Sequence, residues 1–296
     1  RGVSPGVRNG LGHDLHAVLL RQSQRLVEEF HDPAPFSYRQ VALAPCSPFS
    51  VTTDLLKESA ALARSLGVRL HTHLCETKDE ERFCLEVLGQ RPLAYMASCG
   101  WLGEDVWFAH GIHFNDEELR LLAETGTGVA HCPVSNMKLA SGVCRIPDML
   151  RLGVPVGLAV DGSASNDGSN LLQEIRAAYL LHRLTWSQDA PTGYELLKMA
   201  TRGSAAILGR DDIGQLAVGK AGDLLLLDVT GLDLVGATLD PGCLLGTVGY
   251  SKPPKYVLVG GKVVAQEGHL LGIDEARTAE AARTEMLAML AAGKAL

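Results

Sequence analysis

Short apolar runs alternate with amphipathic stretches along the first 205 residues, and this alternation restricts the fold more than any other feature of the chain. Expected strands begin near residues 39, 68, 106, 128 and 156. Expected helices lie between these strands, and Gly67 and Gly153 close two of them. Strands joined by helices form βαβ units, whose strands pair in a parallel sheet. The sequence therefore predicts an α/β fold over residues 1–205.

Polar or otherwise unusual residues stand at the ends of these expected strands. They are Cys46 (after Pro45), His73, His110, His131 and Asp161. In a β/α barrel the active site lies at the carboxyl ends of the strands, where such side chains come together. Neutral imidazoles and carboxylates are common ligands of Zn²⁺ and Fe²⁺. The recurrence at successive strand ends therefore predicts a metal or acid–base site at this edge of the sheet.

Two carboxylates near these ends suit proton transfer. Glu76 lies just past the strand that carries His73, within reach of the expected site. Asp161 is followed by a loop of small polar residues, and a carboxylate there can bind a metal ion and accept a proton from water. Both residues are therefore candidates for catalysis.

Plainer interpretations stand beside each candidate. His71 and His73 lie two residues apart on one face of a strand, where they could be hydrogen-bonded histidines of a buried sheet. Asp161 could cap a helix or a turn. Asn136 follows His131 in a segment with Pro and Ser, which is also typical of an ordinary turn.

Composition and missing motifs remove several classes of function. The net charge is −7 and no Lys/Arg cluster is present, which argues against a nucleic-acid partner. No apolar run is long enough to span a bilayer. The seven cysteines are scattered without a CxxC pair, which indicates free thiols in a reducing compartment such as the cytoplasm. The sequence also lacks three catalytic motifs: the P-C-x-x-C site of one class of deaminases, the H-E-x-x-H motif of metallopeptidases and the G-x-S-x-G motif of serine hydrolases.

The pattern changes after residue 205. Residues 206–273 contain short apolar strands and a Gly260-Gly261 dipeptide suited to a tight hairpin turn, which predicts a small β-rich subdomain. Residues 274–296 are helical by composition. We therefore expect three parts: a barrel portion over 1–205, the β subdomain and a C-terminal helix.

The ordered set of strand-end residues, with Glu76 among them, resembles the amidohydrolase superfamily. It is most similar to the branch that includes guanine deaminase, S-adenosylhomocysteine deaminase and the triazine hydrolases. Within that branch, the blocks HCPVSNMKLASG from His131 and VDGSASNDG from Val160 look most like the 8-oxoguanine deaminases, and APCSPFS from Ala44 agrees. The resemblance implies a (β/α)8 barrel of the TIM type with a small β-rich subdomain.

Roles for individual residues follow from this resemblance. His73 and Asp161 would ligate one divalent metal ion, Zn²⁺ or alternatively Fe²⁺, and Asp161 would also act as general base. Glu76 would protonate a ring nitrogen, and His110 would orient the attacking oxygen. The remaining assignments are substrate contacts from Cys46, Ser47 and Asn136, a role for His131 outside the metal shell, and a structural role for His71.

The implied reaction is hydrolytic deamination of an oxidised purine in purine catabolism. With 8-oxoguanine as substrate, a metal-activated water would yield urate and ammonia. Alternative substrates in the same branch are an s-triazine, guanine, a pterin or S-adenosylhomocysteine. The resemblance implies a small heterocycle as the binding partner and a homodimer or higher homo-oligomer.

One part of the family pattern is missing. Relatives carry an H-x-H metal pair at the end of the first barrel strand, and no such pair precedes residue 39. The five visible strands correspond to strands four to eight by the resemblance. We therefore expect the first three barrel strands to be missing from this chain, which leaves an inactive truncated homologue as a further alternative.

Overall fold

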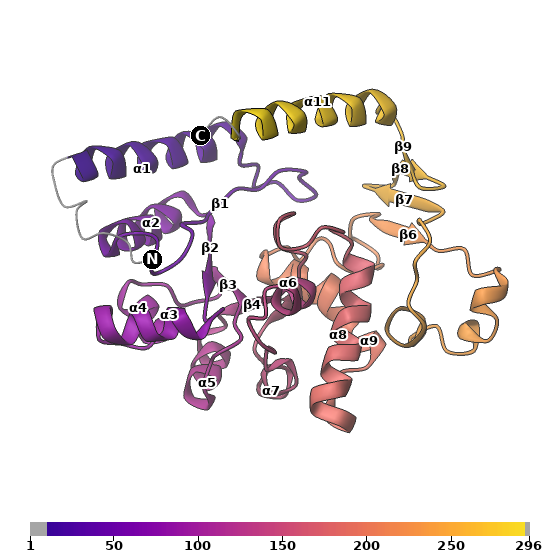
Figure 1. The fold of residues 1–296 in the computed structure, drawn as a ribbon, viewed down its shortest axis with the longest axis horizontal. Helices are drawn as coiled ribbons and strands as arrows, with labels where there is room; N and C mark the ends of the chain where they lie inside the picture. The colour runs from indigo at the N-terminus through magenta and orange to yellow at the C-terminus, as the bar shows by residue number, and fades with distance from the viewer. Residues whose placement is uncertain (1–10, 294–296) are drawn as a thin grey trace.

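Two sheets organise the part of the protein that its computed structural model describes, residues 11–293 (Figure 1). The larger sheet has five parallel strands in the order β1-β2-β3-β4-β5. They are β1 (Ala42–Leu43), β2 (Arg69–Leu74), β3 (Val106–His110), β4 (Gly128–His131) and β5 (Val156–Leu158). The predicted strands and their parallel pairing are therefore confirmed.

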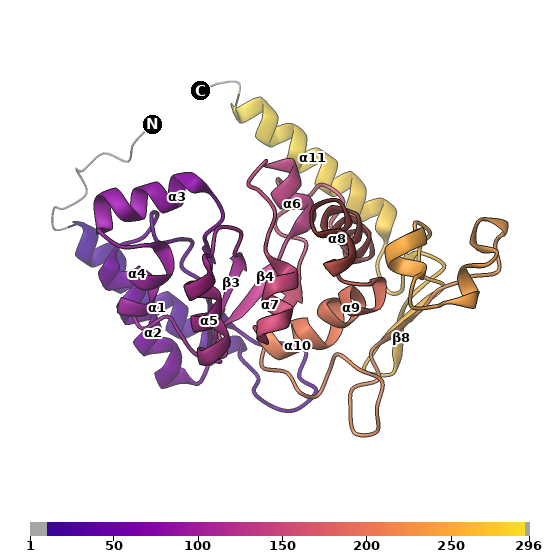
Figure 2. The same ribbon diagram turned by 90° about the horizontal axis from the view of Figure 1, so that it is seen from below.

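Helices connect the strands of this sheet. They are α2 (Thr53–Leu66), α3 (Lys78–Phe83), α4 (Pro92–Ser98), α5 (Asp116–Thr125), α6 (Pro133–Lys138) and α7 (Ile146–Leu152), and α8 (Leu171–Trp186) follows β5. A π-helical turn, Cys84–Leu88, joins α3 to α4. Figure 2 shows α2 to α5 gathered on the β3 side and α6 to α10 on the β4 side.

Local sequence explains where these helices begin and end. The Thr52 side chain accepts the N–H of Leu55 at the start of α2, and Gly67 ends that helix with φ +66°. Segment 133–138, which is also typical of a turn, forms α6 instead. Pro133 is its first residue, where the missing N–H of proline costs no helical hydrogen bond.

Burial along β2 alternates and so sets the direction of its histidines. Leu70, Thr72 and Leu74 are buried against the helices. His71 and His73 point to the opposite face and are half-buried there. Since successive residues of a strand alternate between faces, the sequence pattern itself places both imidazoles on one side of the sheet.

The core lies between the larger sheet and the helices that cover it. Fully buried apolar side chains come from each layer: Leu56 of α2, Met96 of α4, Phe108 of β3, Leu122 of α5 and Met149 of α7. Each such side chain stabilises the fold by roughly 1.5–3 kcal/mol relative to exposure. This packing holds the strand ends rigidly with respect to one another.

A second, antiparallel sheet follows α9 (Gly193–Lys198) and α10 (Ser204–Ile207). Its strands are β6 (Leu224–Leu226), β7 (Tyr256–Val259), β8 (Lys262–Gln266) and β9 (His269–Leu270). Gly260 and Gly261 join β7 to β8 with φ +56° and +76°, so the predicted hairpin is confirmed. The domain boundaries after residues 205 and 273 stay predictions.

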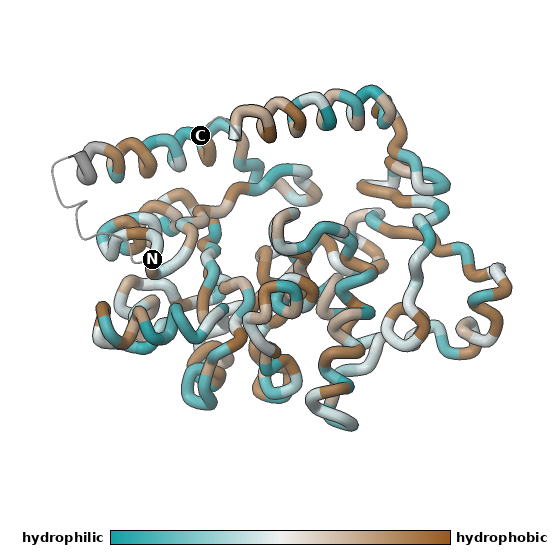
Figure 3. The backbone as a smooth tube through the Cα atoms, viewed as in Figure 1, coloured by the Kyte–Doolittle hydropathy of each residue, from teal (hydrophilic) through white to brown (hydrophobic). Residues whose placement is uncertain are grey.

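Two helices lie along one side of the molecule (Figure 1). The first, α1 (Leu11–Phe30), packs against α2, and the second, α11 (Glu275–Gly293), is exposed along its whole length. Apolar residues alternate with polar ones along α11 (Figure 3), and Met286, Leu287, Met289 and Leu290 are at least half exposed. Among residues 11–293, no helix is both long and apolar enough to cross a bilayer.

Candidate metal and catalytic site

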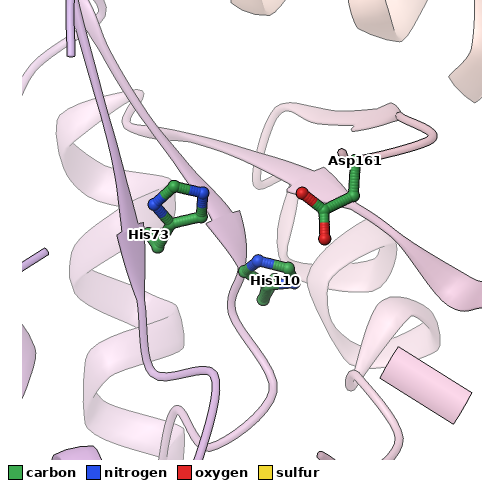
Figure 4. A group of neighbouring side chains, drawn as sticks. All are labelled: His73, His110 and Asp161. Carbon is green, nitrogen blue, oxygen red and sulfur yellow. The ribbon is translucent and has the colours of Figure 1, made fainter. Parts of the chain in front are cut away.

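Three predicted residues meet at the carboxyl edge of the larger sheet. His73 lies in β2, His110 ends β3, and Asp161 lies just beyond β5. One ligand atom from each residue lies within 4.8 Å of the other two. Figure 4 shows the three side chains close together beside the ends of the strands. Two imidazoles and a carboxylate at this spacing fit a divalent metal ion such as Zn²⁺.

The backbone at two of these positions is strained. His110 and Asp161 have φ values of +70° and +67°, in the left-handed region that residues other than glycine rarely adopt. Such conformations cost of order 1–3 kcal/mol and gather at functional sites. The turn that follows each strand therefore directs the side chain into the cluster at an energetic cost.

Cys46 fixes the orientation of His73 through its main chain. The Nδ1 of His73 lies 2.6 Å from the carbonyl oxygen of Cys46, which can only accept a hydrogen bond. In a neutral ring, this contact places the proton on Nδ1 and leaves the lone pair on Nε2 for a metal ion. The Cys46 side chain is exposed, with Sγ 4.0 Å from the same Nδ1.

His110 lies between two polar side chains. Its Nδ1 is 2.9 Å from Oδ1 of Asn136, and its Nε2 is 3.8 Å from Oε2 of Glu76. Asn136 is fully buried, and its side-chain oxygen contacts His110. The substrate contact that we expect from Asn136 stays a prediction. Glu76 lies beside the cluster, where a carboxylate could move a proton.

Serine hydroxyls stabilise the ionised form of Asp161. Its Oδ2 accepts hydrogen bonds from Ser135 at 2.6 Å and from Ser165 at 2.8 Å. Burial alone would raise the pKa of Asp161, but these hydroxyls and the N–H of Gly162 together hold it below the ordinary value. The carboxylate is therefore charged at neutral pH and ready to bind a cation.

A single short helix supports both His110 and Asp161. Ser135 and Asn136 are consecutive in α6, and they contact Asp161 and His110 respectively. Buried Glu174 of α8 accepts the N–H of Val134 at 3.1 Å and so holds the start of α6. The sequence interpretation assigned no role to Ser135 or Glu174, although Ser135 directly precedes the candidate Asn136.

Two other predicted residues lie outside the three-residue cluster. Ser47 is buried, and its hydroxyl donates to the Ser50 hydroxyl at 2.7 Å. The ring of His71 stacks on Trp107 with centroids 4.9 Å apart, and burial lowers the pKa of His71 to about 4. The substrate role of Ser47 therefore stays a prediction, and His71 has the packing of a structural residue.

His131 is not part of the cluster and pairs with a histidine that we did not predict. Its Nε2 lies 3.2 Å from Nε2 of His182 in α8, and both residues are fully buried. Within α8, His182 shares the buried face with Glu174 and Ala178 at spacings of four residues. The sequence did contain a signal for His182: a histidine and a glutamate at helical spacing on the face of α8 that packs against the sheet.

This pair predicts a loss of stability in mild acid. Burial lowers the pKa of His182 to about 4, and it lowers the pKa of His131 well below the ordinary value. Both rings charge more readily in the unfolded chain, near pH 6.5, so stability falls as pH drops from about 6.5 to 4. For His182 alone we expect roughly 3 kcal/mol over this range.

Urea unfolding at a series of pH values measures this effect. We expect His182→Phe to flatten the curve below pH 6.5, whereas His269→Phe, which removes an exposed pair with Glu275, changes the slope far less. An equal slope in wild type and His182→Phe would contradict the assignment.

Comparison of the sequence with known protein families gives a match that includes every residue of this site. A profile of the amidohydrolase family matches residues 4–264. The chain belongs to the amidohydrolase family. The predicted family is therefore confirmed, and its known members offer a direct comparison.

Two enzymes are similar to most of this chain. The 8-oxoguanine deaminase of Pseudomonas aeruginosa is 46% identical over 274 residues, covering 93% of this chain and 61% of that protein. The hydroxydechloroatrazine ethylaminohydrolase of Pseudomonas sp. (strain ADP) is 45% identical over 268 residues, covering 90% of this chain and 55% of that protein. The chain thus spans 55–61% of the length of these two relatives.

Solved structures of two enzymes share the fold. Atrazine chlorohydrolase TrzN from Arthrobacter aurescens TC1, complexed with zinc, matches with a TM-score of 0.87 at 32% identity, over 91% of this chain and 60% of that one. An adenosine deaminase from Xanthomonas campestris with bound zinc matches with a TM-score of 0.81 at 28% identity, over 92% and 61%. The predicted α/β fold of the TIM-barrel type, with a separate antiparallel sheet, is therefore confirmed.

Proposed function

We propose that this amidohydrolase is a metal-dependent aminohydrolase that deaminates an oxidised purine such as 8-oxoguanine to urate and ammonia. The observation that carries the proposal is the cluster of His73, His110 and Asp161, with Glu76 placed 3.8 Å from His110. The 46% identity to the 8-oxoguanine deaminase of Pseudomonas aeruginosa supports the choice of substrate.

His73 and Asp161 are the residues that would hold the metal ion. Nδ1 of His73 donates to the Cys46 carbonyl, so Nε2 is left to coordinate, and Asp161 offers an ionised carboxylate. This donor set suits Zn²⁺ and also Fe²⁺, and zinc is the ion in the related solved structures. A bound divalent ion lowers the pKa of water from 15.7 towards about 7, which supplies a nucleophile at neutral pH.

The residues of this chain supply the proton transfers of the reaction. Asp161 takes a proton from the attacking water, and His110 holds the attacking oxygen beside the carbon that bears the amine. Glu76 gives a proton to the adjacent ring nitrogen. Asp161 passes its proton to the amine as the carbon–nitrogen bond breaks, so ammonia leaves. Glu76 recovers a proton from the added hydroxyl, which becomes the carbonyl of the product. Each step places one of these three side chains at an atom that gains or loses a proton.

A triazine is the second candidate substrate. The relative at 45% identity is a hydroxydechloroatrazine ethylaminohydrolase, so similarity alone separates the two substrate classes poorly. In both cases the leaving group is an amine on a carbon of a nitrogen heterocycle. The same residues could therefore serve either reaction.

Metal analysis and a substrate panel test the proposal. We expect the purified protein to hold about one Zn²⁺ or Fe²⁺ per chain, and chelation to abolish activity that added metal restores. Ammonia release with 8-oxoguanine should exceed that with guanine and isoxanthopterin, and amine release from hydroxyatrazine should be slower still. A protein without bound metal would overturn the enzyme proposal, and no turnover of any purine or pterin would overturn the substrate class.

Ser135 is expected to influence metal affinity. Replacing it with alanine removes the 2.6 Å hydrogen bond to Asp161, so the carboxylate loses part of its orientation and its charge stabilisation. We expect Ser135→Ala to weaken Zn²⁺ binding by about 10-fold or more, as measured by competition with a chelator. Ser59→Ala, a change at a buried serine in α2, should leave the affinity unchanged. Equal affinities in the two variants would refute the role of Ser135.

The remaining predictions extend this proposal. We propose a small heterocycle as the binding partner, without nucleic acid or membrane, and a homodimer or higher homo-oligomer as the working form. Cytoplasmic location is supported by the seven cysteines, all of which are free in the structure. Size-exclusion chromatography with light scattering tests the oligomeric state.

A further inference from the structure

Glu80 is a buried carboxylate that the proposed reaction does not use. It lies in α3 and is 3% exposed. Its Oε1 accepts the N–H of Cys75 at 2.8 Å, and its Oε2 accepts the N–H of Glu76 at 3.0 Å. Burial raises the pKa of Glu80 to about 7, although these two hydrogen bonds lower it. A carboxylate in such a costly position calls for a role beyond helix formation.

The reach of Glu80 differs from that of similar glutamates in this chain. Glu118 in α5 and Glu195 in α9 also occupy the third helical position, and each accepts the N–H of its own N-cap residue in a capping box. Glu80 extends past its N-cap, Thr77, to the two residues that precede it. Its carboxylate therefore serves the turn between β2 and α3.

This turn is strained and is held on both sides of Cys75. Cys75 is buried with φ +53°, a conformation that favours glycine. Its carbonyl oxygen accepts the N–H of Ile112 at 2.9 Å and that of His113 at 3.0 Å, both from the loop after β3. Glu80 holds the N–H of the same residue. The strained conformation is thus fixed from α3 and from the neighbouring loop together.

The turn determines where Glu76 points. Its carboxylate lies 3.8 Å from His110, which ends β3 directly before the loop that binds the Cys75 carbonyl. We propose that Glu80 is a positioning residue, whose carboxylate holds the left-handed turn at Cys75 and so directs Glu76 towards His110 and the substrate ring. This inference rests on the proposed function, in which Glu76 carries the proton.

Glu80→Gln in the metal-loaded protein is the central test. The amide oxygen can accept one N–H, but the NH₂ group faces the other N–H and repels it. At about pH 8.5, where Glu80 is ionised in the wild type, we expect kcat to fall at least about 10-fold while KM and metal content change less than about threefold. Glu195→Gln, a matched change in an ordinary capping box, should keep kcat within about twofold.

Amide hydrogen exchange in the metal-free protein gives a readout that does not depend on activity. We expect the Cys75 and Glu76 amides to exchange at least about 10-fold faster in Glu80→Gln, with unchanged exchange at Phe108 and Ala109 of β3. Faster exchange at all four amides would indicate general destabilisation and would overturn the positioning role. Unchanged exchange at Cys75 and Glu76 would overturn it as well.

A rescue variant keeps the test decisive if Glu80→Gln folds poorly. Glycine adopts the φ of Cys75 without strain, so Cys75→Gly should lessen the need for Glu80. We expect the double variant to recover kcat by at least about threefold over Glu80→Gln. A double variant that gains nothing would overturn the proposal. If wild type turns over no heterocycle, the proposed function fails, whereas the exchange result still decides whether Glu80 holds the turn.

Discussion

Asp161→Ala is expected to lower kcat by at least about 10⁴-fold, because one change removes both a proposed metal ligand and the proposed general base. The Ser135 and Ser165 hydroxyls that now bind the carboxylate would be left without it. We also expect bound zinc to fall well below one ion per chain. Steady-state ammonia release and metal analysis of the same preparation measure the two effects together.

The fold should survive this change. Asp161 is half-buried beyond the end of β5, and alanine removes a charge that burial disfavours. Asp167→Ala in the same loop is a suitable control, because that carboxylate is exposed and pairs with Lys138 at 2.6 Å. We expect wild-type activity in the control. Activity of Asp161→Ala within tenfold of wild type would refute the assigned roles.

Glu76→Gln is expected to lower kcat by about 10²- to 10⁴-fold while leaving the metal in place. Glutamine has nearly the same shape as glutamate, but it cannot deliver a proton to a ring nitrogen. In the proposed reaction this side chain carries a proton and does not hold the metal ion, which His73 and Asp161 would bind. Loss of turnover with unchanged zinc content therefore distinguishes this variant from Asp161→Ala.

A second glutamate controls for the loss of charge. Glu86→Gln alters an exposed carboxylate in the π-helical turn after α3, and we expect unchanged kinetics. A substrate whose ring nitrogen is already protonated should lose less rate in Glu76→Gln than one that must gain a proton. Equal losses for both kinds of substrate would show that Glu76 acts on a different step.

The positions of the main site residues could be read from the sequence because parallel strands share one carboxyl edge. His73, His110 and Asp161 follow apolar runs, so the alternation of strands and helices alone brings them to that edge. Their approach within 4.8 Å agrees with this reasoning. Their chemical roles stay predictions, since geometry shows proximity and not proton transfer.

The supporting contacts could not be read in the same way. Cys46 holds His73 through a carbonyl oxygen, which every residue type possesses, so side-chain identity carries no signal for it. Glu80 lies in a helix with acidic neighbours, where it is typical of favourable charge near a helix N-terminus. Only the three-dimensional course of the turn reveals that its carboxylate faces backwards to Cys75.

Some elements of the fold could likewise be predicted from the sequence and others could not. Strands and long helices follow from hydrophobic periodicity, and they lie where the sequence predicts. The short helix α6 could not be predicted in this way. Its six residues resemble a turn, and Pro133 and the contact with Glu174 in α8 favour the helical form. Its stability comes from tertiary contacts that span about 40 residues of sequence, which a local pattern cannot report.

The left-handed backbone at His110 and Asp161 sets a limit on how far this protein can be made heat-resistant. Glycine is the residue that tolerates those conformations best, so each position holds back stability that a glycine would release. Selection for thermostability alone would favour that exchange, and it would remove an imidazole or a carboxylate from the site. An engineering campaign should therefore keep both positions fixed and seek its gains elsewhere, for example along the exposed surface of α11.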